Sequence, residues 1–268
     1  MNEERKAVID KDFLIELRRN AYIECTENFL ESNTVVGIFG DRLPEHVFYA
    51  CGVVPVPIEG VDSHIFKFGK ENEGEGFCDV IKSTLIYLTT QKCPILYSCK
   101  MYVLENACNS FIEVLKANTK KPVAVYKNDE ELLQILCNVY GTNYNETIKE
   151  NAKTDLDYIK NILTKIKYYS DISTEELFLL EFYSKYMMDL KMRRKYFEQL
   201  EKTINFSITK REIKKLPCIC PRGNYKAVCR EIKDSNTIIE RMCDGTKMAD
   251  YGYANCIFDC TKKRNYEI

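Results

Sequence analysis

The sequence has few histidines and no excess of charge of either sign. His46 and His64 are its only histidines, and neither belongs to an HExxH motif or a cysteine–histidine pair, so we interpret both as structural. With so few histidines, no Ser/His/Asp arrangement can be proposed. Lys and Arg number 39 against 40 Asp and Glu, so the formal net charge is −1. This balance provides no field that would attract a polyanion, which argues against nucleic acid as a partner.

Long apolar runs and glycine-rich nucleotide motifs are also missing. No run of 18 or more apolar residues occurs, and the N-terminus, MNEERKAVIDKDF, is charged from its third residue. We therefore expect neither a signal peptide nor a membrane span, and we expect a cytoplasmic protein with no membrane partner. Gly37, Gly40 and Gly52 do not form GxGxxG or a P-loop lysine motif, which argues against nucleotide binding by this chain.

Cysteine, in contrast, is abundant. The chain has 13 cysteines, and those between Cys218 and Cys260 are crowded into a short part of it. Structural disulfides are rare in a reducing cytosol, so this number of cysteines indicates metal binding or redox chemistry. Soft thiolate ligands select zinc, Cu(I) and iron–sulfur clusters.

Strand-like and helix-like segments alternate between residues 34 and 140. Four short runs rich in β-branched residues are the predicted strands: TVVGIF (34–39), VVPVPI (53–58), MYVLE (101–105) and KPVAVYK (121–127). Helices are predicted before the first run, after the first and third runs, and after Cys78. This order predicts an α/β fold, with a parallel-sheet lobe of Rossmann-like, three-layer type and right-handed crossovers.

The rest of the chain divides into two parts, which gives expected domains at residues 1–145, 146–206 and 207–268. Residues 146–206 have long helical periodicity and predict a helical pair, whose second helix starts at the Ser173-Thr174-Glu175-Glu176 cap. We interpret its aromatic stripe as packing surface rather than a cofactor site. In the cysteine-rich tail, the spacing of Cys256 and Cys260 is compatible with a zinc module. A second iron–sulfur cluster, or simply reduced thiols, are the alternatives for the tail.

Three candidate site residues follow the predicted strands. Glu59 comes directly after the second strand, and Cys78 and Cys108 each precede a predicted helix. Ligands of open parallel sheets bind outside the carboxyl ends of the strands, and the first turn of a helix stabilises an anion such as a thiolate. The positions of Cys78 and Cys108 in the sequence do not by themselves exclude a structural role, because free cysteines are often buried as small apolar residues.

Several segments resemble a known family. PEHVFYACGVVPVPIEG (44–60), CDVIKSTLIY (78–87) and VLENACNSFIEVL (103–115), followed by KPVAVY and the helical pair, are similar to subunits of the 2-hydroxyacyl-CoA dehydratase family. This family includes the 2-hydroxyglutaryl-CoA dehydratase D component and benzoyl-CoA reductase-type subunits. The resemblance covers roughly residues 10 to 205. It implies an oxygen-sensitive iron–sulfur cluster, of the 4Fe-4S type, held by three cysteines, two of which correspond to Cys78 and Cys108.

The sequence departs from the family pattern at several points. Asp79 stands where a proline usually follows the first cysteine, and Asn109-Ser110-Phe111 replaces the usual Asp-Gly-Lys-Lys stretch. About 60 residues follow the helical pair where the family continues into a second α/β lobe. Within them, Cys220-Pro221 and the nearby Tyr225 are similar to the surroundings of the third ligand, which makes Cys220 a candidate metal ligand.

Two hypotheses for function follow from the resemblance. The first is a cluster-dependent lyase or reductase subunit of anaerobic metabolism, acting on an acyl-CoA thioester. It would receive one electron from a separate ATP-hydrolysing activator protein, form a ketyl radical at the thioester carbonyl and expel a 2- or 3-substituent, with Glu59 as catalytic proton carrier. A homologous subunit or a second copy of the chain would complete its site. The second hypothesis is a non-catalytic zinc- or cluster-binding partner or maturation protein derived from that family.

Overall fold

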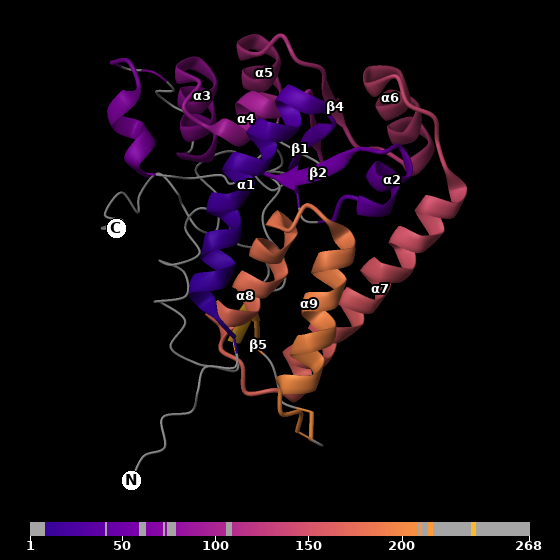
Figure 1. Cartoon of the computed structure of the whole chain (residues 1–268). Coiled ribbons are helices and arrows are strands. Elements are labelled where there is room, and N and C mark those ends of the chain that lie inside the picture. Colours follow the sequence, from indigo (N-terminus) through magenta and orange to yellow (C-terminus); the bar gives the residue numbers. More distant parts are fainter. Residues whose placement is uncertain are drawn as a thin grey trace.

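The computed structural model describes residues 9–40, 42–58, 63–71, 73, 79–105, 109–207, 209–210, 214–216 and 237–239. Within these ranges, a parallel sheet with its helices forms one part of the molecule, and a group of longer helices lies beside it (Figure 1).

The sheet has four parallel strands: β1 (Val35–Phe39), β2 (Val54–Pro57), β3 (Met101–Leu104) and β4 (Val123–Val125). Their order is β2-β1-β3-β4, with Val35 opposite Val54 and Val36 opposite Met101. All four coincide with the predicted runs, so the predicted parallel sheet is confirmed. The two central strands are buried along their whole length, as strands covered on both faces are. The prolines of β2 lie in an edge strand, where a missing N–H is tolerated.

Helices cover both faces of the sheet, which makes the lobe a three-layer structure (Figure 1). The helical segments of this lobe are α1 (Lys11–Glu31), α2 (Glu45–Ala50), the 3-10 helix η1 (Ser63–Phe68), α3 (Asp79–Thr90), α4 (Pro94–Ser98), α5 (Asn109–Asn118) and α6 (Asp129–Tyr140). Successive side chains of a strand point to opposite faces. Accordingly, Tyr102 and Leu104 of β3 pack with Leu115 of α5, whereas Met101 and Val103 pack with α2 and α6.

The helical part contains α7 (Glu146–Tyr169), α8 (Thr174–Tyr183), the 3-10 helix η2 (Ser184–Tyr186) and α9 (Leu190–Thr203). The second helix of the predicted pair is therefore interrupted. Two polar residues explain the break: Ser184 Oγ donates to the Leu180 carbonyl, and Asp189 accepts from the amides of Lys191 and Met192 as the cap of a new helix.

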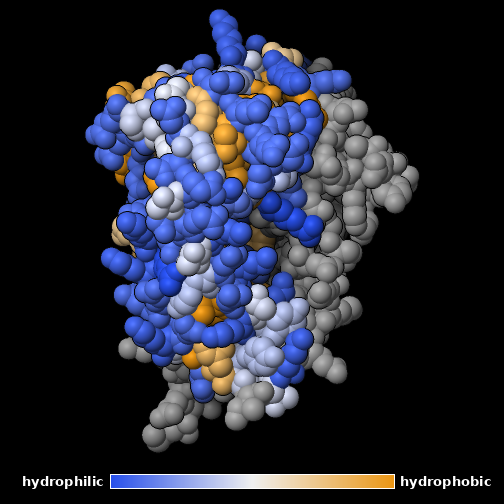
Figure 2. All heavy atoms as spheres, turned by 90° about the vertical axis from the view of Figure 1, so that its right-hand side faces the viewer, coloured by the Kyte–Doolittle hydropathy of each residue, from blue (hydrophilic) through white to orange (hydrophobic). Residues whose placement is uncertain are grey.

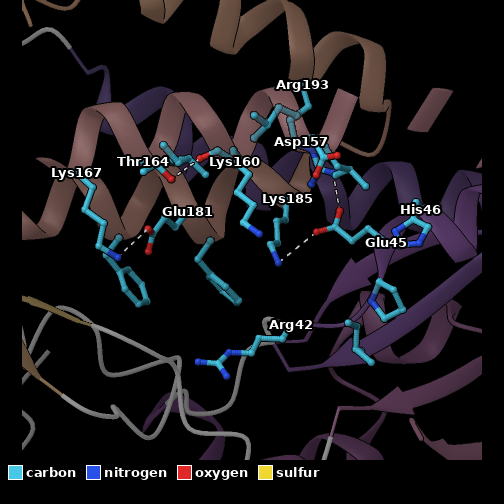
Figure 3. Close-up of a pocket in the computed structure, with 18 residues that line it drawn as sticks. Arg42, Glu45, His46, Asp157, Lys160, Thr164, Lys167, Glu181, Lys185 and Arg193 are labelled. Carbon is cyan, nitrogen blue, oxygen red and sulfur yellow. Dashed lines mark hydrogen bonds and ion pairs between the residues drawn. The ribbon is translucent and has the colours of Figure 1, made fainter. Parts of the chain in front are cut away.

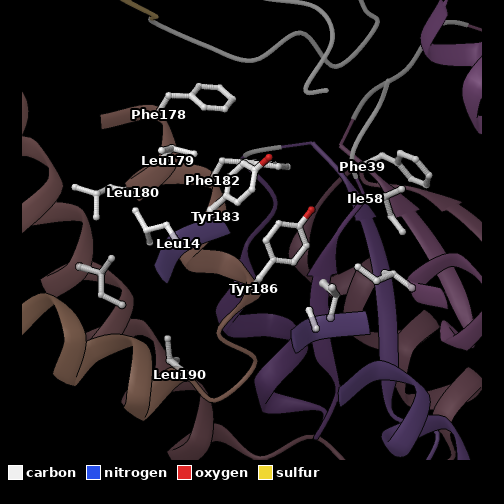
Figure 4. Packing of buried hydrophobic residues seen from close by; sticks show 14 of the residues in the cluster. Leu14, Phe39, Ile58, Phe178, Leu179, Leu180, Phe182, Tyr183, Tyr186 and Leu190 are labelled. Carbon is white, nitrogen blue, oxygen red and sulfur yellow. The ribbon is translucent and has the colours of Figure 1, made fainter. Parts of the chain in front are cut away.

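Helix α8 is mostly apolar after its first turn. Leu177, Phe178, Leu179, Leu180 and Phe182 are all buried, and α8 packs between α1 and α7. Figure 4 shows Phe182 beside Tyr183, with Tyr186 of η2 close to both. The aromatic stripe thus serves as packing surface, as the sequence predicted.

Two short strands from the tail complete the described structure. Strand β5 (Lys214–Leu216) pairs in parallel with β6 (Thr237–Ile239).

On the side of the molecule that carries α6 and α7, hydrophilic residues cover most of the described surface, with narrow apolar strips between them (Figure 2). No helix in the described ranges has both the length and the apolar character that crossing a bilayer requires.

The predicted start of the helix after residue 173 is confirmed as a capping box. Ser173 Oγ accepts from the Glu176 amide at 3.3 Å, and the Glu176 carboxylate accepts from the Ser173 amide at 2.9 Å. Replacing Ser173 by Ala should lower the free energy of unfolding by about 1 kcal/mol. Urea denaturation would measure this loss, and Thr164→Ala, at an exposed position within α7, is the control. Equal stability of the two variants would contradict the capping role.

Candidate functional site

The strand order places a topological switch point between β1 and β3 at the carboxyl edge of the sheet. After β1 the chain turns through α2 to β2 on one side, and after β3 it turns through α5 to β4 on the other. Ligands of open parallel sheets bind at such a switch point. Gly40 and Glu105 follow the ends of β1 and β3 there. The Glu105 amide donates to the Phe39 carbonyl at 2.8 Å, and the Glu105 carboxylate accepts from the Arg42 amide at 3.1 Å.

All four predicted site residues, Glu59, Cys78, Cys108 and Cys220, lie outside the described residues. The elements next to three of them are described. The structure describes α3 from Asp79 and α5 from Asn109, the residues after Cys78 and Cys108, and the two helices contact each other. Strand β2 ends two residues before Glu59. The positions of Cys78 and Cys108 directly before helices stay a prediction.

Five other cysteines are described, and they are core residues. Cys25, Cys51 and Cys99 are buried, whereas Cys93 and Cys137 are partly exposed. Burial is the main reason why the pKa of Cys25 and of Cys51 is raised to about 12, and it raises the pKa of Cys99 well above its usual value. In Cys51 a hydrogen bond to Cys137, with 3.6 Å between the two sulfurs, adds to the effect. No group of three or more His, Cys, Asp or Glu side chains in the described part of the chain could hold a metal ion.

These raised pKa values predict low reactivity. A thiol with a pKa of about 12 is ionised in only about one molecule in ten thousand at pH 8, and the thiolate is the nucleophile. In the native protein, iodoacetamide at pH 8 should leave Cys25, Cys51 and Cys99 unmodified, and it should modify them in urea. Peptide mass spectrometry would measure this pattern. Modification of Cys99 within minutes in the native protein would contradict it.

Charged side chains converge on a cavity of about 670 Å³ between the two parts of the molecule. Its walls come from the loop after β1 with the start of α2, from the middle of α7, from α8 with η2, and from Arg193 of α9 (Figure 3). Arg42 lies beside both the switch point and the cavity, because its amide donates to the Glu105 carboxylate and its side chain lines the cavity.

A buried ionic group forms one end of this cavity. Arg193 Nη2 lies 2.5 Å from Glu45 Oε2, and Lys185 Nζ lies 3.2 Å from Glu45 Oε1. Burial alone would raise the pKa of Glu45, but the charges and hydrogen bonds of Arg193 and Lys185 outweigh it and lower that pKa to about 2. Glu45 is therefore ionised at neutral pH. One atom of the group, Arg193 Nε, is buried without a hydrogen-bond partner among the described residues.

Our interpretation of the sequence did not predict this cavity. Glu45 and Arg193 are 148 residues apart, and no local pattern connects them. The sequence of α7 does contain one indication of a positively charged surface. Lys153, Lys160 and Lys167 are spaced by seven residues and so share one helix face. Of these three, Lys160 and Lys167 line the cavity.

Comparison with known proteins adds no relationship. The chain matches no protein-family model, and no curated protein is significantly similar to it.

Proposed function

We propose that the chain is an iron–sulfur cluster-binding subunit of the 2-hydroxyacyl-CoA dehydratase type, which acts on an acyl-CoA thioester. Cys78 and Cys108 would hold the cluster with Cys220 as the third ligand, and Glu59 would carry a proton. A cluster bound there would supply a single electron, received from an ATP-hydrolysing activator protein. A homologous subunit or a second copy of the chain would complete the site.

The observation that supports this proposal best is the strand order β2-β1-β3-β4. With this order, the switch point lies beside the carboxyl end of β3, and Cys108 comes four residues after the last residue of that strand in the sequence. The helix that follows Cys78 packs against the helix that follows Cys108. Two thiolates at the starts of neighbouring helices would both gain from the free amides there, and thiolates are the ligands that iron–sulfur clusters require.

The described cysteines support the same choice of ligands by elimination. Cys25, Cys51 and Cys99 are buried among apolar core residues, and no group of three or more His, Cys, Asp or Glu side chains in the described part of the chain could hold a metal ion. A cluster in this chain would therefore draw its ligands from the cysteines outside the described core.

Anaerobic purification followed by iron, zinc and acid-labile sulfide analysis tests the proposal. We expect about four iron and four sulfide per chain or per cluster-sharing pair, as a 4Fe-4S cluster requires. Cys78→Ala and Cys108→Ala should each lose most of the iron, whereas Cys137→Ala, at a partly exposed cysteine of the core, should keep it. Glu59→Gln should keep the iron and lower turnover by roughly 100-fold.

The alternative outcomes separate the two hypotheses. Zinc without sulfide would reject the cluster and favour the non-catalytic metal-binding partner. Iron retained in both Cys78→Ala and Cys108→Ala would reject these two cysteines as ligands. A protein without metal after anaerobic purification would reject both hypotheses.

A further inference from the structure

The cavity between the loop after β1 and helices α7 and α8 has the size of a small-molecule site. Its volume is about 670 Å³, and ligand pockets are commonly about 300 to 1,000 Å³. The lining residues that the structure describes come from the loop after β1 and from α2, α7, α8, η2 and α9, and none of them is a cysteine.

The cavity has an excess of positive charge. Five of its described lining residues are Lys or Arg and three are Asp or Glu, which leaves two positive charges uncompensated. Glu45 is already paired with Arg193 and Lys185, and Glu181 lies 3.9 Å from Lys167. In the described part of the chain, neither the Arg42 guanidinium nor the Lys160 ammonium makes an ion pair, so these two cations are available to a ligand.

Several of these cationic side chains point into the same part of the cavity. Figure 3 shows Lys160 and Lys185 reaching into the open space from one wall, and Arg42 lying across it on the facing loop. Lys185 is held in place by Glu45, which is itself fixed by the buried Arg193. An anion between these walls could accept charge-assisted hydrogen bonds from both sides, and such bonds are about twice as strong as neutral ones.

Part of the remaining lining is apolar. Leu156 and Leu163 of α7, and Pro44 just before α2, are partly exposed residues in this part of the wall. A hydrated inorganic ion would leave this surface in contact with water, whereas an apolar group of the ligand would cover it. A neutral apolar ligand would instead leave the cations without counter-charges. The lining therefore fits a molecule that has an anionic end and an apolar body.

We propose that this cavity binds a small organic anion, a phosphate ester or carboxylate that carries a short acyl or aryl group. Arg42 and Lys160 bind the anionic group from opposite walls, and Leu156 and Leu163 pack against the apolar group. Lys185, positioned by Glu45 and Arg193, adds a third positive charge at the same end of the cavity.

Isothermal titration calorimetry of the full chain with four probes tests the proposal: phenyl phosphate, benzoate, benzyl alcohol and inorganic phosphate. We expect phenyl phosphate or benzoate to bind with a dissociation constant below about 1 mM, which is reasonable for a ligand with roughly ten heavy atoms. The tighter of these two identifies the anionic group. Benzyl alcohol, which lacks the charge, and inorganic phosphate, which lacks the ring, should each bind at least about tenfold more weakly.

Three variants connect that affinity to the cavity. Arg42→Gln and Lys160→Gln should each weaken binding by roughly tenfold or more, because each removes a charge-assisted hydrogen bond. Lys153→Gln is the matched control, since Lys153 is an exposed lysine of the same helix that does not line the cavity. Both cavity variants replace exposed side chains, so circular dichroism should show them folded.

Three results would overturn the proposal. The first is no binding of phenyl phosphate or benzoate at 10 mM. The second is equal affinity for inorganic phosphate and phenyl phosphate, which would mean that the apolar wall contributes nothing. The third is an equal effect of Lys160→Gln and Lys153→Gln, which would indicate a non-specific response to net charge rather than a site.

Discussion

Replacing Arg193 by Met is expected to lower the free energy of unfolding by about 3 to 5 kcal/mol, the usual cost of removing one partner of a buried ion pair. Arg193 is only 2% exposed and its guanidinium lies 2.5 Å from the Glu45 carboxylate. Without it, Glu45 would remain in the interior with Lys185 as its single cation. Urea denaturation at pH 7, followed by circular dichroism, would measure the loss.

Two further variants make this result specific. The double variant Glu45→Gln with Arg193→Met should recover much of the loss, because no uncompensated charge then remains buried. Arg194→Met is the control at the neighbouring position. Arg194 pairs with Asp155 and Glu198 nearer the surface, where ion pairs contribute about 1 kcal/mol or less. Equal effects of Arg193→Met and Arg194→Met would refute the role given to the buried group.

The same group predicts how stability depends on pH. The pKa of Glu45 is about 2 in the folded protein and about 4.5 when the residue is unpaired, so its ionised form is favoured by folding. Its contribution is fully present above about pH 4.5 and is lost as the pH falls from there towards 2. In the Arg193→Met variant this loss should be much smaller.

Gly40→Ala should be the second costly substitution, lowering the free energy of unfolding by about 3 kcal/mol or more. Gly40 has φ +133°, where a side chain alone costs up to about 3 kcal/mol of strain. A Cβ atom there would also lie 2.3 Å from the Cβ atom of Glu105, close to the backbone of β3, so the strand end itself would have to move.

The matched control is Gly52→Ala. Gly52 also has positive φ, at +67°, but no atom lies within 4 Å of the position of its Cβ. This variant should cost about 1 kcal/mol, the conformational term alone. If thermal denaturation gave equal losses for Gly40→Ala and Gly52→Ala, close contact between the loops after β1 and β3 would not be important for stability.

The elements that were predictable from sequence are those with a local cause. Val35, Val36 and Ile38 form a short β-branched run bounded by Gly40, and Asn145 and Ser173 are caps that precede helical periodicity. The break between α8 and α9 was missed because the apolar pattern continues through Tyr186 and Met187, although Ser184 and the Asp189 cap indicate it. The cap is weaker as a signal than the periodicity around it.

The charged cavity could not be predicted for a different reason. Its ion pairs join Glu45 to Lys185 and Arg193, and such long-range pairs depend on how the helical part packs against the sheet. At the switch point, the strand order confirmed the expected parallel sheet, but the residues predicted to bind the cluster lie outside the described part of the chain. Their roles remain predictions.

The packing of α1 also has a consequence for the order of events during synthesis. This helix leaves the ribosome before most of the chain, yet it packs against α8 and η2, and Lys11 pairs with Glu175 at 2.8 Å across 164 residues. Leu14, Ala21 and Cys25 are buried only in the completed fold. A nascent chain can therefore cover part of this helix with β1 and α4 once about residue 98 has emerged, but the apolar positions that face α8 and η2 stay exposed until about residue 186, a period in which binding by a chaperone would compete with aggregation.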